Sequence, residues 1–356
     1  MIEHDYTRDQ VVGCLLAGAV GDALGARAVD DRENHADHDD TAPAATFGRT
    51  GPVTDATRMT VFTAEGLIRA AVRKRERGIC HPPTVLHHAY LRWFATRGSA
   101  GVASPHLAEL DGWIVGVPEL WRTGDPDDPG LTALRTGRMG STDGPINDAP
   151  GYGALVRAAP AGILAARRRF ELGCEFAAIT HGHPSGIYPA GALAVIVGAL
   201  VDGADLTSAL DRAEGELREP PRAATTLTAL RAGRSLGTAG IPTPDDLASL
   251  GSGDTGHEVL AIAVACAVGG YDRPGAALRA SVDHPGARAA AGSVCGNILG
   301  AAHGTRWLLP TWLEELELRE VVARLAEDCH RACRIGVPTE VDGTVTADWL
   351  RRYPGW

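Results

Sequence analysis

Helical spacing of apolar residues, with almost no alternating strand-like runs, is the feature that most restricts how this 356-residue chain can fold. Near the start, Val11, Val12, Leu15, Leu16 and Ala19 recur at intervals that place them on one face of a helix. Similar helical patterns occur at residues 59–77, 83–97, 154–171, 191–202, 223–232, 258–268, 292–302 and 318–334. The sequence therefore predicts an all-α fold.

Alanine and glycine dominate several of these helical segments, for example AGAVGDALGA at 17–26 and AGALAVIVGALVDGA at 190–204. Small side chains let helix backbones approach closely, which favours a compact bundle of many helices. None of the loops rich in charge, glycine or proline has the composition of a flexible interdomain linker. We therefore expect a single domain that spans residues 1–356.

The charge balance narrows the range of partners. With 44 Asp and Glu against 34 Lys and Arg, the formal charge is −10, whereas binding to nucleic acid or to an anionic membrane needs a basic face. The first ten residues, MIEHDYTRDQ, lack the basic and apolar regions of a secretory signal. No apolar run approaches the ~18 residues of a membrane span. We expect a soluble, cytoplasmic protein whose seven cysteines are reduced thiols.

Five segments carry distinctive motifs in order along the chain: GCLLAGAVGDALGA at 13–26, TDATRMT at 54–60, GYGALVRAAPAGIL at 151–164, THGHP at 180–184 and VDHPGARAAAGSVCGNILG at 282–300. Together they resemble the motifs of the ADP-ribosylglycohydrolase family. The resemblance implies a single all-α domain with a central cleft. In that cleft two Mg²⁺ ions would lie near the ribose of an ADP-ribosyl group and assist cleavage at its C1″ carbon.

The resemblance also implies metal ligands that this chain lacks. The second aspartate of the first acidic segment aligns with Ala56, and with Gly286 at the family glycine, Ala287 and Ala289 take the two later aspartate positions. Ala290 takes the position of the hydroxyl ligand. Two adjacent dications need several carboxylates, because hard ions require oxygen ligands and their mutual repulsion must be offset. We therefore predict no dimagnesium centre, and at most one weakly held Mg²⁺.

Two arginines near the altered positions suggest how an anion could still bind. Thr54 and Asp55 remain from the first acidic segment, Arg58 follows them, and Arg288 lies between the two replaced aspartates. A guanidinium could occupy the volume of a metal ion and pair with a phosphate or carboxylate of the ligand. The alternative is that each arginine is solvated or structural. The predicted ligand is an anionic small molecule, ADP-ribose-like or derived from NAD.

The same region offers candidates for metal-independent catalysis. Asp55 should face the cleft, and Asp283 and His284 come just before the altered segment. A histidine and paired carboxylates can move protons and assist glycoside cleavage, in a hydrolase or lyase type of reaction. Capping of the following turn is the alternative role of Asp283. Asp22, within GDALGA, is predicted to be a structural hydrogen-bonding residue.

The remaining candidates lie on segments that the resemblance assigns to ribose and phosphate binding. Glycines there permit close backbone approach, and their N–H groups can bind phosphate oxygens. These candidate ligand-binding residues are Asn147, Gly151, Tyr152, Gly153 and His181. Arg157 is on the same segment, where a structural salt bridge is the favoured role.

Three hypotheses about function remain open. The first is a divergent family member that binds an ADP-ribose-like anion without the metal pair. The second is a non-catalytic pseudoenzyme that acts as a binding or interaction protein, with a protein partner. The third is residual Mg²⁺-dependent ADP-ribosyl hydrolysis. The residues are compatible with an enzyme and with a non-catalytic protein.

Overall fold

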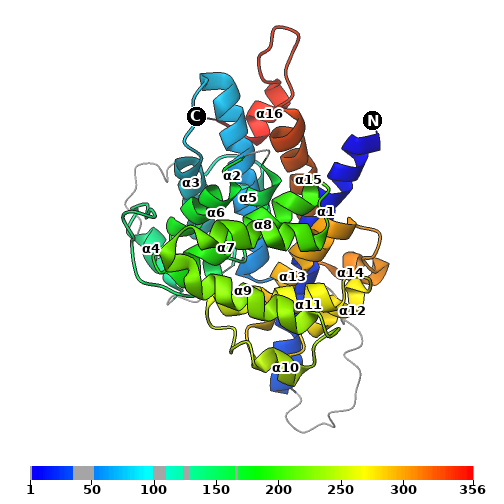
Figure 1. The fold of residues 1–356 in the computed structure, drawn as a ribbon. Helices are drawn as coiled ribbons and strands as arrows, with labels where there is room; N and C mark the ends of the chain where they lie inside the picture. Colours follow the sequence, from blue (N-terminus) through cyan, green and yellow to red (C-terminus); the bar gives the residue numbers. More distant parts are fainter. Residues whose placement is uncertain (1, 35–51, 99–109, 123–127, 165–166, 356) are drawn as a thin grey trace.

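The computed structural model describes residues 2–34, 52–98, 110–122, 128–164 and 167–355 (Figure 1). Within these ranges the chain forms helices and no β-strand, and the only extended pairings are two isolated bridges, Gly151–Thr255 and Thr339–Val345. The all-α fold predicted from the sequence is confirmed. The α-helices are α1 (Ile2–Asn34), α2 (Asp55–Arg77), α3 (Pro82–Thr96), α4 (Pro129–Arg135), α5 (Ala159–Ile163), α6 (Arg169–Ala178), α7 (Pro184–Val201), α8 (Leu206–Arg218), α9 (Ala224–Gly237), α10 (Pro244–Ala248), α11 (Gly256–Gly269), α12 (Pro274–Ala280), α13 (Arg288–His303), α14 (Pro310–Glu315), α15 (Arg319–His330) and α16 (Ala347–Arg352).

The helix predicted at 154–171 is wrong as a single element, because the structure divides it into α5 and α6. Leu164 ends α5 with an extended backbone (φ −58°, ψ 134°), and α6 begins only at Arg169. The Nε of Arg169 donates to the backbone oxygen of Leu164 over 2.8 Å. This bond satisfies one of the carbonyls that the end of a helix leaves without a partner. The apolar residues of both short helices face the same core, which is why their spacing resembles one longer helix.

Helices α1 and α13 pack with their backbones in contact, and glycine makes this approach feasible (Figure 1). A Cβ atom added to Gly21 would lie 2.0 Å from the backbone oxygen of Gly292, and one added to Gly25 would lie 2.3 Å from the nitrogen of Ala289. Any side chain at these points would force the helices apart. The first turn of α13 is therefore held against the 21–25 segment of α1.

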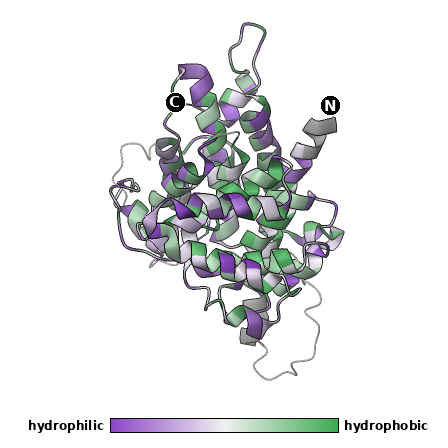
Figure 2. Ribbon diagram, in the orientation of Figure 1, coloured by the Kyte–Doolittle hydropathy of each residue, from purple (hydrophilic) through white to green (hydrophobic). Residues whose placement is uncertain are grey.

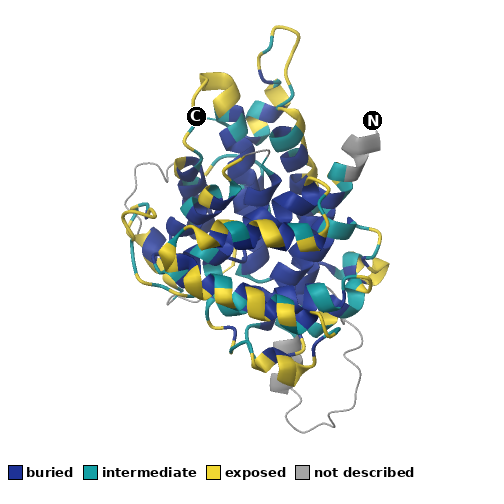
Figure 3. Cartoon of the chain, in the orientation of Figure 1, coloured by how far each residue is buried: buried dark blue, intermediate teal, exposed yellow. Residues whose placement is uncertain are grey.

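Two helices are more apolar than the sequence prediction allowed. The segments Thr7–Arg27 and Pro184–Val201 are each long and apolar enough to cross a membrane, so the expectation that no such run exists is wrong. Yet 78% and 89% of their apolar windows are buried inside the fold. Figures 2 and 3 show the same correspondence, with the hydrophobic segments at the centre of the molecule where burial is greatest. Their composition is that of core helices in this fold.

A buried ionic network joins α2, α3 and the end of the chain. Glu65 of α2 is fully buried and accepts hydrogen bonds from Arg69 and from Arg92 of α3. Arg69 also pairs with Asp111 at 2.7 Å and donates to the backbone oxygen of Pro354. Because buried charges are tolerated only when they are paired, these bonds fix the orientation of α2 within the bundle.

Candidate functional site

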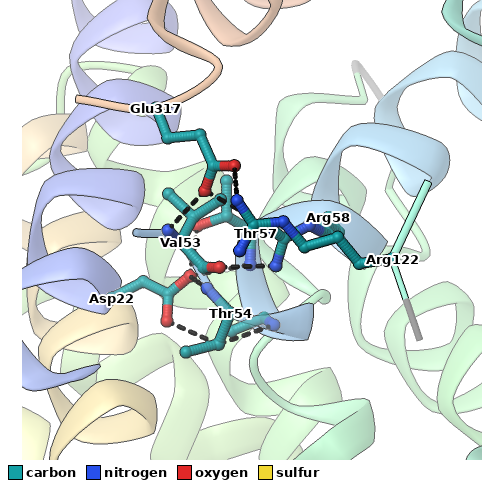
Figure 4. Close-up of polar contacts among 8 residues, drawn as sticks. Asp22, Val53, Thr54, Thr57, Arg58, Arg122 and Glu317 are labelled. Carbon is teal, nitrogen blue, oxygen red and sulfur yellow. Dashed lines mark hydrogen bonds and ion pairs between the residues drawn. The ribbon is translucent and has the colours of Figure 1, made fainter. Parts of the chain in front are cut away.

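The start of α2 is held by a buried carboxylate on α1. The Oδ1 of Asp22 accepts a hydrogen bond from the Oγ1 of Thr54 (2.6 Å) (Figure 4). The Oδ2 accepts from the backbone nitrogens of Thr54 (2.9 Å) and Thr57 (3.1 Å) and from the Oγ1 of Thr57 (2.6 Å). Burial raises the pKa of Asp22, although these hydrogen bonds act in the opposite direction. The structural role predicted for Asp22 is confirmed.

The hydroxyl of Thr54 makes two hydrogen bonds where α1 meets the start of α2. It donates to Asp22 and also accepts from the backbone nitrogen of Ala56 (3.1 Å), so that it caps the N-terminus of α2. The family resemblance makes Thr54 a ligand-binding candidate. In this structure its hydroxyl hydrogen is already committed to Asp22.

Asp55, the first residue of α2, pairs with an arginine that the sequence did not single out. One carboxylate oxygen lies 2.8 Å from Nη2 of Arg97, while the other, Oδ1, is buried and has no hydrogen-bond partner among the described residues. The side chain as a whole is 40% exposed. Burial raises the pKa of Asp55, while the charges of Arg97 and Arg58 lower it and that of Asp128 raises it further. Its net raised pKa makes Asp55 a better proton acceptor than an ordinary surface aspartate.

Arg58 is buried and is paired within the protein. Its guanidinium donates to the backbone oxygen of Val53 and to Oε2 of Glu317 (3.0 Å). Glu317 in turn accepts from the backbone nitrogen of Val53 (2.9 Å) and from Arg122 (2.6 Å), as Figure 4 shows. Burial lowers the pKa of Arg58, and the charge of Glu317 acts against this. Arg58 therefore fixes the segment before α2 to Glu317, and its prediction as a ligand contact stays untested.

The segment before α13 presents a neutral histidine. The Nδ1 of His284 accepts from the backbone nitrogen of Gly286 (3.0 Å), so the ring proton is assigned to Nε2. That Nε2 is buried without a hydrogen-bond partner among the described residues. Burial, together with the charge of Arg288, lowers the pKa of His284 to about 4, despite the opposing charge of Asp283. Asp283 itself is exposed, whereas Arg288 is buried at the first position of α13.

The 147–153 segment is held in place by backbone contacts. The side chain of Asn147 donates to the oxygen of Thr180 (2.8 Å) and accepts from the nitrogens of Ala149 (3.1 Å) and Gly182 (2.9 Å). The nitrogen of Gly256 donates to the oxygen of Pro150 (3.2 Å), beside the bridge between residues 151 and 255. Asn147 therefore shapes this loop through three bonds to the backbone.

At the tip of this loop, open space and an aromatic ring are available to a ligand. A Cβ atom added to Gly151 would meet nothing within 4 Å. Tyr152 is 36% exposed, and burial of its hydroxyl, with the charges of Asp128 and Asp254, raises its pKa. The charge of Asp128 also raises the pKa of Asp55.

Buried side chains support the loop from below. Arg157 donates to Thr180 Oγ1 (2.6 Å), and its guanidinium lies 4.4 Å from the ring centroid of Tyr90. The Thr180 hydroxyl also forms a hydrogen bond with Nδ1 of His181 (2.8 Å). Burial and the charge of Arg157 lower the pKa of His181 to about 3. The ring of His181 lies beneath Gly153, where an added Cβ would approach it to 3.2 Å.

One turn of α1 brings the two altered segments together. Asp22 binds the start of α2, while Gly25, three residues later, contacts Ala289 in the first turn of α13. The 252–254 loop connects α13 to the 147–153 segment, because Gly286 packs against Ser252 and residue 255 bridges to Gly151. The predicted site residues therefore lie on segments that are neighbours in the fold.

The side chains present do not fit a pair of magnesium ions. Within the described ranges there is no group of three or more His, Cys, Asp or Glu residues that could hold a metal ion. The positions that the resemblance predicts to align with family aspartates carry Ala56, Ala287 and Ala289. Asp55 is already balanced by Arg97. Such a site cannot offset the repulsion between two adjacent dications.

The described part of the chain is all-α, and the candidate site lies between helix ends and a glycine-containing loop. The sequence pattern of the ADP-ribosylglycohydrolase family matches residues 3–336, and the chain belongs to that family. Its structure is similar to a solved structure described as an "ADP-ribosylglycohydrolase-related protein complex", with a TM-score of 0.63 and 21% sequence identity. The alignment covers 92% of this chain and 99% of the other, and at that identity it shows the fold alone. No curated protein matches the chain.

Proposed function

We propose that this family member binds an ADP-ribose-like anion in the cleft without a dimagnesium centre. The observation that supports the proposal is the ion pair of Asp55 with Arg97, together with three alanines at positions that the resemblance assigns to metal ligands. These alanines, Ala56, Ala287 and Ala289, have no ligating atom. The 147–153 loop nevertheless keeps its backbone bonds and its open tip.

The start of α13 supplies the positive potential that the proposal needs. The N-cap of this helix is Ala287, which has no polar side chain, so the first N–H groups of α13 are not capped by that residue. The positive end of the helix dipole favours an anion there. Arg288 adds a charge, and the Nε2–H of His284 is a buried donor that still lacks an acceptor among the described residues. An anionic oxygen would provide one.

The proposed chemistry is metal-independent. Asp55, whose pKa is raised and whose Oδ1 lacks a partner, is the candidate proton acceptor. With its pKa near 4, His284 is neutral at pH 7 and acts as a hydrogen-bond donor rather than as an acid. Asp283 is exposed and remains the second candidate carboxylate. The proposal places the protein in the cytoplasm, consistent with its seven free cysteines.

Calorimetric titration with ADP-ribose in excess EDTA tests the binding step. We expect binding that is unchanged by added Mg²⁺ and weakened roughly 10-fold in Tyr152→Ala, because stacking on an aromatic ring contributes about 1–3 kcal/mol. Leu309→Ala is the matched control, since Leu309 is similarly exposed (40%) but lies outside the cleft. Binding that disappears on chelation would contradict the metal-free site. Indifference to ADP-ribose, NAD and phosphate would instead favour the non-catalytic interaction protein.

A restoration experiment tests the reason for the missing metal. The triple variant Ala56→Asp, Ala287→Asp, Ala289→Asp returns three carboxylates to the altered positions. It should be less stable than the original protein in EDTA, because like charges then face one another, and should be stabilised by millimolar Mg²⁺ in a thermal-shift assay. The unaltered protein should show no such shift. Equal responses of the two proteins to Mg²⁺ would refute the role assigned to the replaced carboxylates.

A further inference from the structure

A cavity of about 500 Å³, which shares no lining residue with the candidate site, lies between α6, α7, α8 and the π-helical turn η5 (Arg331–Ile335). Figure 1 shows α6, α7 and α8 as neighbouring helices. The volume is within the range of small-molecule sites. The charged lining consists of Arg167, Arg169, Arg212, Arg334, Asp202 and Glu216.

One part of this lining is a pre-formed ionic cluster. Asp202 accepts two bonds from Arg169 (2.6 and 3.2 Å) and one from Arg334 (2.7 Å). The stem of Arg169 crosses α7 at Gly198, where an added Cβ would lie 2.4 Å from its Cδ. Burial raises the pKa of Asp202, but the bonds and charges of the two arginines outweigh it and lower the pKa overall. Two arginines and one aspartate give the cluster a net charge of +1.

Two further arginines in the lining remain unpaired. Arg167 precedes α6 and Arg212 is on α8, and among the described residues neither has a hydrogen bond or ion pair. Glu216, the other lining carboxylate, does not pair with them. Its neighbours are acidic instead, and burial together with the charges of Glu171 and Glu219 raises its pKa. Four guanidinium groups therefore face two carboxylates, in a protein whose formal charge is −10.

The rest of the lining is apolar. Phe170, Val195 and Ala199 form this part of the cavity, and the ring of Phe170 stacks on Tyr188 with 6.3 Å between centroids. A ligand with a charged end and an apolar or ring-containing end matches such a wall. The planar fork of a guanidinium matches phosphate oxygens in geometry as well as in charge.

We propose that this cavity binds a small phosphate monoester. Its phosphate is held by Arg167 and Arg212 beside the Arg169–Asp202–Arg334 cluster, and its organic part lies against Phe170. The cavity shares no residue with the cleft, so it does not depend on the function proposed for the cleft.

Calorimetric titration of the full-length protein with phenyl phosphate and with inorganic phosphate, at about 50 mM salt, tests this assignment. The double variant Arg167→Gln, Arg212→Gln should weaken both ligands at least about 10-fold, because each loses charge-assisted hydrogen bonds. The double variant Arg168→Gln, Arg306→Gln is the matched control. It removes the same charge from two exposed arginines outside the cavity and should change either affinity by less than about twofold.

Phenyl phosphate should bind more tightly than inorganic phosphate, because its ring buries apolar area against Phe170. Equal weakening by both double variants would show that only the net charge matters, and would overturn the site. Absence of binding by either probe at 10 mM would also overturn it. Since both variants change exposed residues, far-ultraviolet circular dichroism should show an unaltered fold in each.

Discussion

Replacing Asp22 by alanine should destabilise the protein more than replacing any exposed N-cap residue. The variant removes the acceptor of four hydrogen bonds that link α1 to the start of α2, from the backbone nitrogens and hydroxyls of Thr54 and Thr57. Asp22 and Thr57 are both buried, so water cannot readily replace the lost acceptor at Thr57.

The expected loss in the free energy of unfolding follows from the four hydrogen bonds and from their burial. Hydrogen bonds to a charged group contribute about 1.5–3 kcal/mol each, which gives a gross loss well above the final value. Two effects reduce it. The hydroxyls can rotate toward other acceptors, and removal of the carboxylate ends the desolvation that raises its pKa. We expect a net loss of about 3–4 kcal/mol in the free energy of unfolding.

The matched control is Asp205→Ala at the N-terminus of α8. Asp205 accepts from the nitrogen (2.7 Å) and hydroxyl (3.1 Å) of Ser208, but it is exposed. Because water can replace the lost acceptor at this exposed cap, its removal should cost much less than the removal of Asp22. Both variants are compared by urea unfolding at pH 7, followed by circular dichroism, with the m-value checked for two-state behaviour. Equal losses in the two variants would refute the argument that Asp22 holds the start of α2.

Two other predictions concern packing and pH. Gly296→Ala would place its Cβ 2.1 Å from the backbone oxygen of Ala17 and should lower the free energy of unfolding by about 2–3 kcal/mol. Gly215→Ala, whose Cβ would meet nothing within 4 Å, should instead stabilise α8 by up to about 1 kcal/mol. Identical thermal midpoints of the two variants would contradict this prediction. His87, His181 and His284 have pKa values lowered by burial to about 4, 3 and 4, below the 6.5 of an unfolded histidine. Between pH 6.5 and about 4 the unfolded chain binds protons at these histidines and the folded protein does not, so the free energy of unfolding should fall as the pH falls through this range. A urea midpoint that stays constant from pH 7 to pH 4.5 would argue against this prediction.

The arrangement of the candidate site was only partly accessible from the sequence. The resemblance to family motifs predicted that the altered segments and the 147–153 loop come together, and in the structure α1 and the 252–254 loop connect them. The sequence could not predict which residues pair with Asp55 and Arg58. Arg97 is 42 positions from Asp55, and Glu317 is 259 positions from Arg58, with no local pattern that connects either pair. For Arg58 the sequence left a structural role open without naming a partner, and the fold pairs it with Glu317.

The sequence by itself determined the all-α class, because helical periodicity of apolar residues is a local property. It also determined where close helix contacts are permitted, through glycines such as Gly21 and Gly292. Tertiary structure decided which helices meet at those glycines, where the 154–171 segment breaks, and which charges face a cavity. The physical reason is that ion pairs, buried hydrogen bonds and cavities depend on contacts between residues far apart in the chain, and local spacing carries no information about them.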